Sequence, residues 1–325
     1  MRMLPLLLFA LAAQVQHTFT AFETEPRQVA FSRDSQILAT SSVDGFVRFW
    51  RVSDQKSIRV LRHPAGVTSL DFSNDGCLLV TGSYDGSVRI WRVADGALLR
   101  TLQGHSGTVW SVAFSPNAQL VVSSGEDKTV RLWRVGDGAA LRVLRGHTLN
   151  VWHVAFSPDG RLVGSSSFDK TIKLWRVDDG RLVRTLTGHE QAIVGFAFSP
   201  DGRLIASGSD DSTIRLWRLA DGALIRTTPA ANHVYTIAFS PDGRWLASGG
   251  REKGALGTLW KQIAPDRLRG SVEPTVRLWR VSDGALQQEL DGHRDDVRSV
   301  AFSADGNWLA SSSADGTAKL WRLTR

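Results

Sequence analysis

Short runs of alternating apolar and polar residues recur along the chain and are separated by turn sequences. Between residues 151 and 187 this pattern predicts four strands, at 151–157, 161–167, 171–177 and 181–187. Asp-Gly pairs separate the first strand from the second and the third from the fourth, and such pairs between alternating runs are strong hairpin signals. No stretch of the chain has a convincing helical period. The segment therefore predicts a four-stranded antiparallel sheet.

This segment is one of seven near-copies, each with a tryptophan inside a sequence that resembles T-V-R-L-W-R-V. The tryptophans are Trp50, Trp91, Trp133, Trp175, Trp217, Trp279 and Trp321. Their spacings are 41, 42, 42, 42, 62 and 42 residues. Isolated four-stranded sheets would expose apolar faces and unpaired edges, which radial packing around an axis buries. The repeat thus predicts an all-β protein, a seven-bladed β-propeller with one sheet per copy.

The last copy ends at Arg325 after only its third strand. Residues 15–21 resemble fourth-strand segments such as residues 98–104. We therefore expect a strand at about 15–21 to complete the last blade and close the ring, so that residues 14–325 form one domain.

Polar residues recur at fixed distances from the repeat tryptophans. The histidine of a Gly-His pair lies 28 residues before four of the tryptophans, an Asp lies six before most of them, and Ser or Thr lies four before that Asp. Through these residues the chain resembles the WD-repeat β-propellers over about residues 14–325. The resemblance implies hydrogen-bonded tetrads inside the blades. They comprise His105, Ser123, Asp127 and Trp133; His147, Ser165, Asp169 and Trp175; His189, Ser207, Asp211 and Trp217; and His293, Ser311, Asp315 and Trp321.

The His105, Ser123 and Asp127 set contains the residue types of a catalytic triad, but its recurrence in blade after blade favours a structural role. Three departures from the family pattern stand out. Arg follows each repeat tryptophan where the family has Asp, Phe22 replaces the histidine of blade one, and His233 of blade six lies two or three residues late. We expect blades one and six to be less rigid than blades three, four, five and seven.

Loops that join the fourth strand to the next first strand, and the second strand to the third, emerge on one face because the strands are antiparallel. We call this the top face, and the resemblance implies that partners bind there. The candidate partner-binding residues are Tyr84, Trp110, Trp152, Phe168, Tyr235, Trp260 and Arg298. In the alternative interpretation, Trp110 and Trp152 lie between blades and only cap the core. A blade-six insertion at about 251–273, which contains Trp260, is either a partner-contacting loop or a tolerated insertion.

The chain carries a formal net charge of +7, and most of its basic residues are Arg. Arg or Lys flanks each repeat tryptophan, with acidic turn residues such as Asp137 and Asp179 nearby. Local pairing around the circumference therefore explains most of the charge. Nucleic-acid binding, which favours basic residues focused on one face, is a weaker alternative.

The N-terminal residues 1–13 resemble a short signal peptide, with an apolar run at 4–13 that is too short to span a membrane. We expect an exported protein, periplasmic or secreted, if this segment is a leader and a cytoplasmic one otherwise. The single Cys77 excludes an intrachain disulfide.

The sequence as a whole predicts a non-catalytic, monomeric scaffold without a cofactor, which docks proteins or peptides. The alternative is an exported propeller enzyme, of hydrolase or lactonase type, with a metal in the central channel. No phosphate loop or nucleophile elbow is present to favour it.

Overall fold

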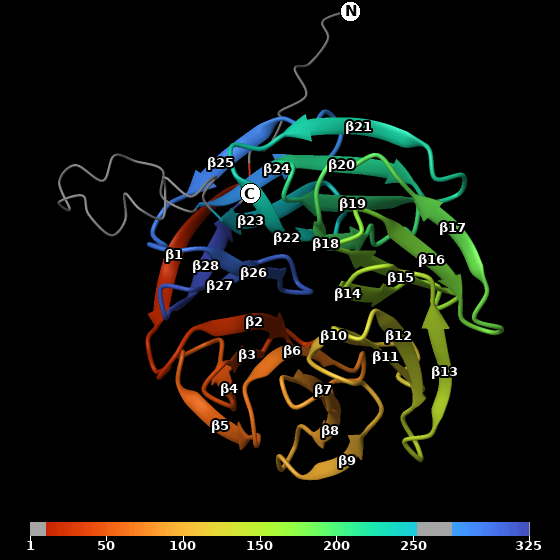
Figure 1. Ribbon diagram of the computed structural model, residues 1–325. Helices are drawn as coiled ribbons and strands as arrows, with labels where there is room; N and C mark the ends of the chain where they lie inside the picture. Colours follow the sequence, from red (N-terminus) through yellow and green to blue (C-terminus); the bar gives the residue numbers. More distant parts are fainter. Residues whose placement is uncertain (1–10, 252–274, 325) are drawn as a thin grey trace, which may run out of the picture.

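Seven four-stranded antiparallel sheets surround a central channel in the computed structural model, which describes residues 11–251 and 275–324. Strands β2, β6, β10, β14, β18, β22 and β26 lie innermost, one from each blade (Figure 1). The predicted seven-bladed propeller is therefore confirmed. No helix in the described ranges is long and apolar enough to cross a membrane.

The blades follow one another along the chain. Blade one holds β2 (Pro26–Phe31), β3 (Ile37–Ser42), β4 (Phe46–Arg51) and β5 (Ser57–Arg62). Blade two holds β6 (Val67–Phe72), β7 (Leu78–Ser83), β8 (Val88–Arg92) and β9 (Leu98–Leu102). Blade three holds β10 (Val109–Phe114), β11 (Leu120–Gly125), β12 (Thr129–Arg134) and β13 (Ala140–Arg145). Blade four holds β14 (Val151–Phe156), β15 (Leu162–Ser167), β16 (Ile172–Arg176) and β17 (Leu182–Leu186).

The last three blades complete the ring. Blade five holds β18 (Ile193–Phe198), β19 (Leu204–Ser209), β20 (Thr213–Arg218) and β21 (Leu224–Pro229). Blade six holds β22 (His233–Phe239), β23 (Trp245–Arg251), β24 (Val276–Arg280) and β25 (Leu286–Leu290). Blade seven holds β26 (Val297–Phe302), β27 (Trp308–Ser313), β28 (Ala318–Thr324) and, from the other end of the chain, β1 (Ala12–Phe19).

The N-terminal strand closes the ring as predicted, with shifted bounds. β1 pairs antiparallel with β28 from Ala12, opposite Thr324, to Phe19, opposite Ala318. The strand covers residues 12–19 rather than about 15–21. In the other blades a tight turn ends the third strand soon after its tryptophan. Here no turn joins the two strands, so both extend three residues past the pair formed by Val15 and Trp321.

The hydrophobic core lies between blades rather than within one sheet. Trp133 of blade three, for example, packs in a buried cluster with Ile90 and Leu102 of blade two and Val121 of its own blade. Each blade therefore supplies one wall of two neighbouring cores. This explains why a strict repeat of apolar positions produces a closed ring.

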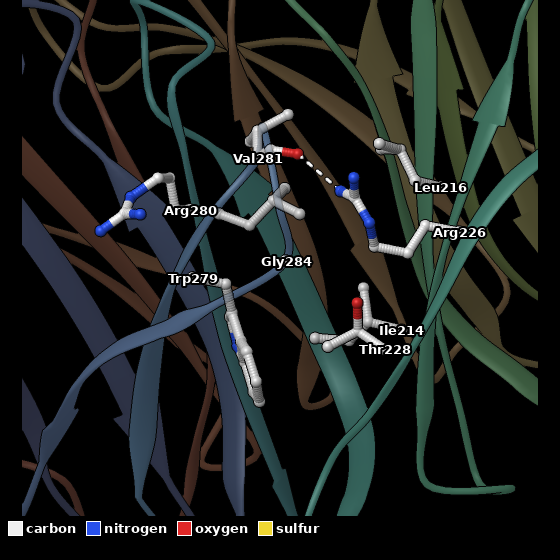
Figure 2. A pocket seen from close by; sticks show the side chains of 9 residues that line it. Ile214, Leu216, Arg226, Thr228, Trp279, Arg280, Val281 and Gly284 are labelled. Carbon is white, nitrogen blue, oxygen red and sulfur yellow. Dashed lines mark hydrogen bonds between the residues drawn. The ribbon is translucent and has the colours of Figure 1, made fainter.

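One of these interfaces, between blades five and six, contains a small gap of about 20 Å³. In blades one to four a leucine near the end of the fourth strand lies against the turn glycine of the following blade, as Leu102 does against Gly138. Thr228 takes that place in blade five and lies against Gly284. Figure 2 shows Thr228 beside Ile214, with the indole of Trp279 across the gap. The shorter side chain leaves the space unfilled.

Candidate functional site

The four polar side chains that the sequence predicts inside blade four form one hydrogen-bonded network. His147 lies 2.8 Å through Nδ1 from Asp169 and 2.8 Å through Nε2 from Ser165. Trp175 Nε1 donates to the Ser165 hydroxyl at 2.8 Å. The corresponding residues meet in the same way in blades three, five and seven. The structure thus brings together all sixteen predicted tetrad residues.

The Ser165 hydroxyl also donates to the Lys173 carbonyl at 3.4 Å, so all three of its partners are internal, and Ser165 is fully buried. Burial alone would raise the pKa of Asp169, but hydrogen bonds from His147 and Thr171 outweigh it and hold the pKa well below its usual range. The carboxylate therefore stays ionised and fixes the imidazole. This network leaves no room for a substrate at the hydroxyl, so its geometry fits a role in strand register.

Blade one replaces the histidine by Phe22 and keeps the rest of the network. Glu23 N donates to Asp44 at 3.3 Å, as the residue after the histidine does in blades three, four, five and seven. Arg48 forms a 2.8 Å ion pair with Asp44 and lies 5.2 Å over the Phe22 ring. An arginine therefore satisfies the carboxylate that the histidine would have held.

Blade two keeps its histidine but loses the Asp contact. His63 Nε2 lies 2.9 Å from Thr81, whereas its Nδ1 is buried without a partner among the described residues. Asp85 is turned away and pairs with Arg89 at 2.6 Å. Burial and the neighbouring Arg89 lower the pKa of His63 to about 4, so its ring is neutral. The sequence did not reveal this, because Arg or Lys stands at that position in every blade.

Blade six retains only the Ser and Trp members among the described residues. Trp279 Nε1 donates to Ser248 at 2.8 Å. His233 instead lies 3.2 Å through Nδ1 from Asp210 of blade five. Glu273, which stands six residues before Trp279 where most other copies have Asp, lies outside the described residues, as do the rest of 252–274 and Trp260.

One residue near the start of each inner strand lies at the top end of the channel, the third residue in β22 and the second in the other six strands. We call these residues the mouth ring: Arg27, Thr68, Trp110, Trp152, Val194, Tyr235 and Arg298. All of them except Thr68 line a cavity of about 110 Å³, together with His153 and other residues that follow them along the inner strands. This cavity is the candidate binding site.

The predicted aromatic residues of the top face contact one another. We call Tyr84, Trp110, Trp152, Phe168 and Tyr235 the aromatic arc. Trp110 and Trp152 stack with ring centroids 4.5 Å apart, and Trp152 stacks on Phe168 at 5.1 Å. Tyr84 meets Trp110, and Tyr235 meets Trp152, edge to face. All five side chains are half-buried, so each both packs against its neighbours and keeps an accessible part.

Two arginines cap the ends of the aromatic arc, and one carboxylate joins them. Arg27 lies 5.9 Å over the Tyr84 ring, and Arg298 lies 5.5 Å over the Tyr235 ring. Glu25 accepts from Arg27 at 2.9 Å and from Arg298 at 3.1 Å. The predicted site residue Arg298 therefore lies at the mouth. Sequence reasoning missed Glu25, whose only signal is its place two residues before Arg27.

Two nitrogen atoms in the cavity wall have no hydrogen-bond partner within the part of the chain that the structure describes. They are Trp110 Nε1 and His153 Nδ1, and both atoms are buried. Burial lowers the pKa of His153 to about 4, so its imidazole is neutral. Buried polar groups are normally paired, which makes these two atoms candidates for contact with a ligand.

Within residues 11–251 and 275–324, no group of three or more His, Cys, Asp or Glu side chains is placed to hold a metal ion. The Arg residues that follow the repeat tryptophans pair with turn carboxylates, as Arg134 does with Asp137 at 2.8 Å. Similar pairs occur in blades one, two, four, five and six. The predicted local pairing of these basic residues around the circumference is present.

Two protein families match this sequence. The family described as "WD domain, G-beta repeat" matches residues 13–51, 55–92 and 284–322. The family described as "IFT122 first beta-propeller" matches residues 109–256. With the seven blades and their tetrads, these matches identify the chain as a member of the WD-repeat β-propeller family.

Several curated proteins are similar over short segments. The small ribosomal subunit protein RACK1y of Oryza sativa subsp. japonica is 40% identical over 62 residues, which cover 19% of this chain and 18% of that protein. The target of rapamycin complex subunit wat1 of Schizosaccharomyces pombe is 38% identical over 65 residues, 19% of this chain and 21% of that protein. The chain thus spans about a fifth of the length of these relatives.

Proposed function

We propose that this chain is a non-catalytic docking platform that binds other proteins or peptides at its channel mouth. The observation that carries the proposal is the aromatic arc, five half-buried rings in continuous contact beside a cavity. Aromatic side chains give large contact areas at low entropic cost and are enriched at binding hot spots.

The tetrads also support a docking function, because they make the blades rigid. In blades three, four, five and seven they satisfy their own polar groups internally, which fixes the blades and leaves the top-face side chains on a rigid frame. The names of RACK1y and wat1 describe subunits of larger assemblies. A docking role for this propeller agrees with those names.

The test is affinity purification from the native host with three versions of the chain. We expect Trp152→Ala to lose proteins that the wild type retains, because it removes the ring that contacts Trp110, Phe168 and Tyr235. Trp308→Ala is the matched control, because Trp308 begins β27, at the opposite end of the blade from the mouth. Identical sets of retained proteins from all three versions, with equal melting temperatures, would contradict the proposal.

We also propose that the chain is exported, on the basis of the leader-like residues 1–13. The fold limits where a leader could be cut. Leu11 and Ala13 are buried in the cluster that contains Trp245 and Trp321. A cleavage that keeps both of these buried side chains in the ring must therefore fall before Leu11. N-terminal sequencing of the protein from the exported fraction tests this, and recovery from the cytoplasm alone would overturn it.

A further inference from the structure

We propose that the channel mouth recognises a carboxylate, the side chain of an Asp or Glu in an acidic peptide segment of the partner. This inference rests on the proposed docking function and specifies its chemistry. The residues that carry it are Arg27, Arg298, Glu25, Trp110 and His153, which come from blades one, three, four and seven.

The first observation is that the molecule already holds a carboxylate at this place. Glu25 precedes β2 and bridges Arg27 of blade one to Arg298 of blade seven. Its side chain is 27% exposed, so solvent and other solutes reach it. A carboxylate from a partner can therefore exchange with Glu25 for the same two guanidinium groups, with little cost for rearranging them.

The second observation is that two positions in the cavity wall lack a side-chain oxygen acceptor that the equivalent positions of the other blades supply. Around most of the channel, a side-chain oxygen on one inner strand accepts the backbone N–H of the next blade. Five junctions have this bond: Gln28 with Leu70, Ser69 with Val112, Ser111 with Val154, Thr236 with Val300 and Ser299 with Val29. At the other two junctions the equivalent residues are His153, which faces Phe196 of the next blade, and Gly195, which faces Ile237. Neither His153 nor Gly195 has a side-chain oxygen that could accept the backbone N–H of that residue.

These two junctions are adjacent, and their residues line the cavity below Arg27 and Arg298. Trp110 Nε1, which can only donate, is unpaired in the same wall. The cavity therefore combines two guanidinium groups, an unpaired indole N–H and two adjacent positions without a side-chain oxygen. A ligand that supplies acceptor oxygens matches this set, and a carboxylate matches it best because it is also attracted by the arginines.

A cationic ligand fits less well. The faces of Tyr84 and Tyr235 already carry Arg27 and Arg298, and the faces of Trp152 are stacked against Trp110 and Phe168. The net charge of +7 also favours the approach of an acidic partner over a basic one. The volume of about 110 Å³ suits one small side chain rather than a whole helix.

The experiment uses two fluorescein-labelled nonapeptide libraries, random except for the central residue, which is Glu in one and Gln in the other. Binding to the full chain is measured by fluorescence polarisation at low and physiological salt. We expect the Glu library to bind about tenfold more tightly than the Gln library. Glu25→Gln should tighten binding of the Glu library several-fold because it removes the carboxylate that pairs with both Arg27 and Arg298, although Asp296 still lies 3.6 Å from Arg298. Arg298→Ala should abolish the preference for Glu, whereas the circumferential variant Arg134→Ala should keep it.

The outcomes separate this inference from the docking function. Equal binding of both libraries by the wild type and by Glu25→Gln, with loss of binding in Trp152→Ala, would overturn the carboxylate inference and leave the docking site in place. A preference for Glu that survives in Arg298→Ala would also overturn it. If neither library binds, and Trp152→Ala retains the same host proteins as the wild type, the docking function itself fails.

Discussion

The Arg100 guanidinium of blade two donates a 2.7 Å hydrogen bond to the backbone carbonyl of Gly136 in blade three. The contact recurs around the circumference, from the outer strand of one blade to the last turn of the next. It joins Arg59 to Ala94, Arg142 to Asp178, Arg184 to Ala220, and Arg226 to Val281 and Ser282. These contacts and the Arg–Asp pairs that follow the tryptophans give much of the arginine content a structural role.

We predict that Arg100→Ala lowers the free energy of unfolding by roughly 0.5–1.5 kcal/mol, the net value of a typical hydrogen bond, because this bond joins two blades but is exposed to solvent. Chemical denaturation followed by tryptophan fluorescence measures the change. Arg134→Ala serves as the control because its pair with Asp137 is exposed and lies within one turn, so it should cost less than about 0.5 kcal/mol. Equal losses in the two variants would show that the contact between blades adds nothing.

The gap between blades five and six predicts a stabilising substitution. Thr228→Leu places in blade five the residue that Leu102 supplies in blade two, and we expect it to raise the free energy of unfolding by about 1 kcal/mol. Thr227→Leu, at the exposed neighbouring position, should change stability little. A lower melting temperature for Thr228→Leu would mean that the gap is too small to accept the larger side chain.

The tetrad of blade four offers a pair of adjacent serines for comparison. Ser165→Ala leaves Trp175 Nε1 and His147 Nε2 buried without a partner, and should cost about 2–4 kcal/mol of unfolding free energy. Ser166 is equally buried, but its hydroxyl has no partner among the described residues. Ser166→Ala should therefore be near neutral. Thermal denaturation of both variants tests the assignment, and similar losses would show that side-chain size rather than the network determines stability.

The contribution of the N-terminal segment to stability can be measured by comparing chains that begin at different residues. A chain that begins at Gln14 lacks buried Leu11 and the bond from Ala13 N to Gln288 at 2.8 Å. Compared with a chain that begins at Leu11, we expect it to lose about 2 kcal/mol or more of unfolding free energy, chiefly from the apolar side chain. If both chains unfold at the same temperature, Leu11 does not contribute to the ring.

The strands and the ring were predictable because their signals are local. An Asp-Gly turn and a tryptophan mark each blade, and residues 15–21 resemble the fourth strands. The aromatic arc followed from position within the repeat. The contact of Glu25 with Arg298 was not predictable, because it depends on how blades one and seven meet at the seam. The pairing of Asp85 with Arg89 instead of His63 was also not predictable from the sequence. Arg or Lys stands at the position of Arg89 in every blade, including those in which the tetrad forms.

Asp71 is the one ionisable residue at a position where the other six blades have alanine, namely Ala30, Ala113, Ala155, Ala197, Ala238 and Ala301. Burial raises the pKa of Asp71 to about 7, although its carboxyl accepts a 2.8 Å bond from Phe114 N. The folded chain therefore holds a proton that the unfolded chain releases between about pH 4 and 7. As a result, this group makes the free energy of unfolding fall as pH rises through that window.

Asp71→Asn keeps a side-chain oxygen that accepts from Phe114 N and removes the titrating group. We expect it to unfold with a free energy larger than the wild type by on the order of 2 kcal/mol at pH 8, and equal to it near pH 4. Denaturation curves at both pH values measure the difference, and a difference that does not change with pH would mean that the carboxyl titrates normally.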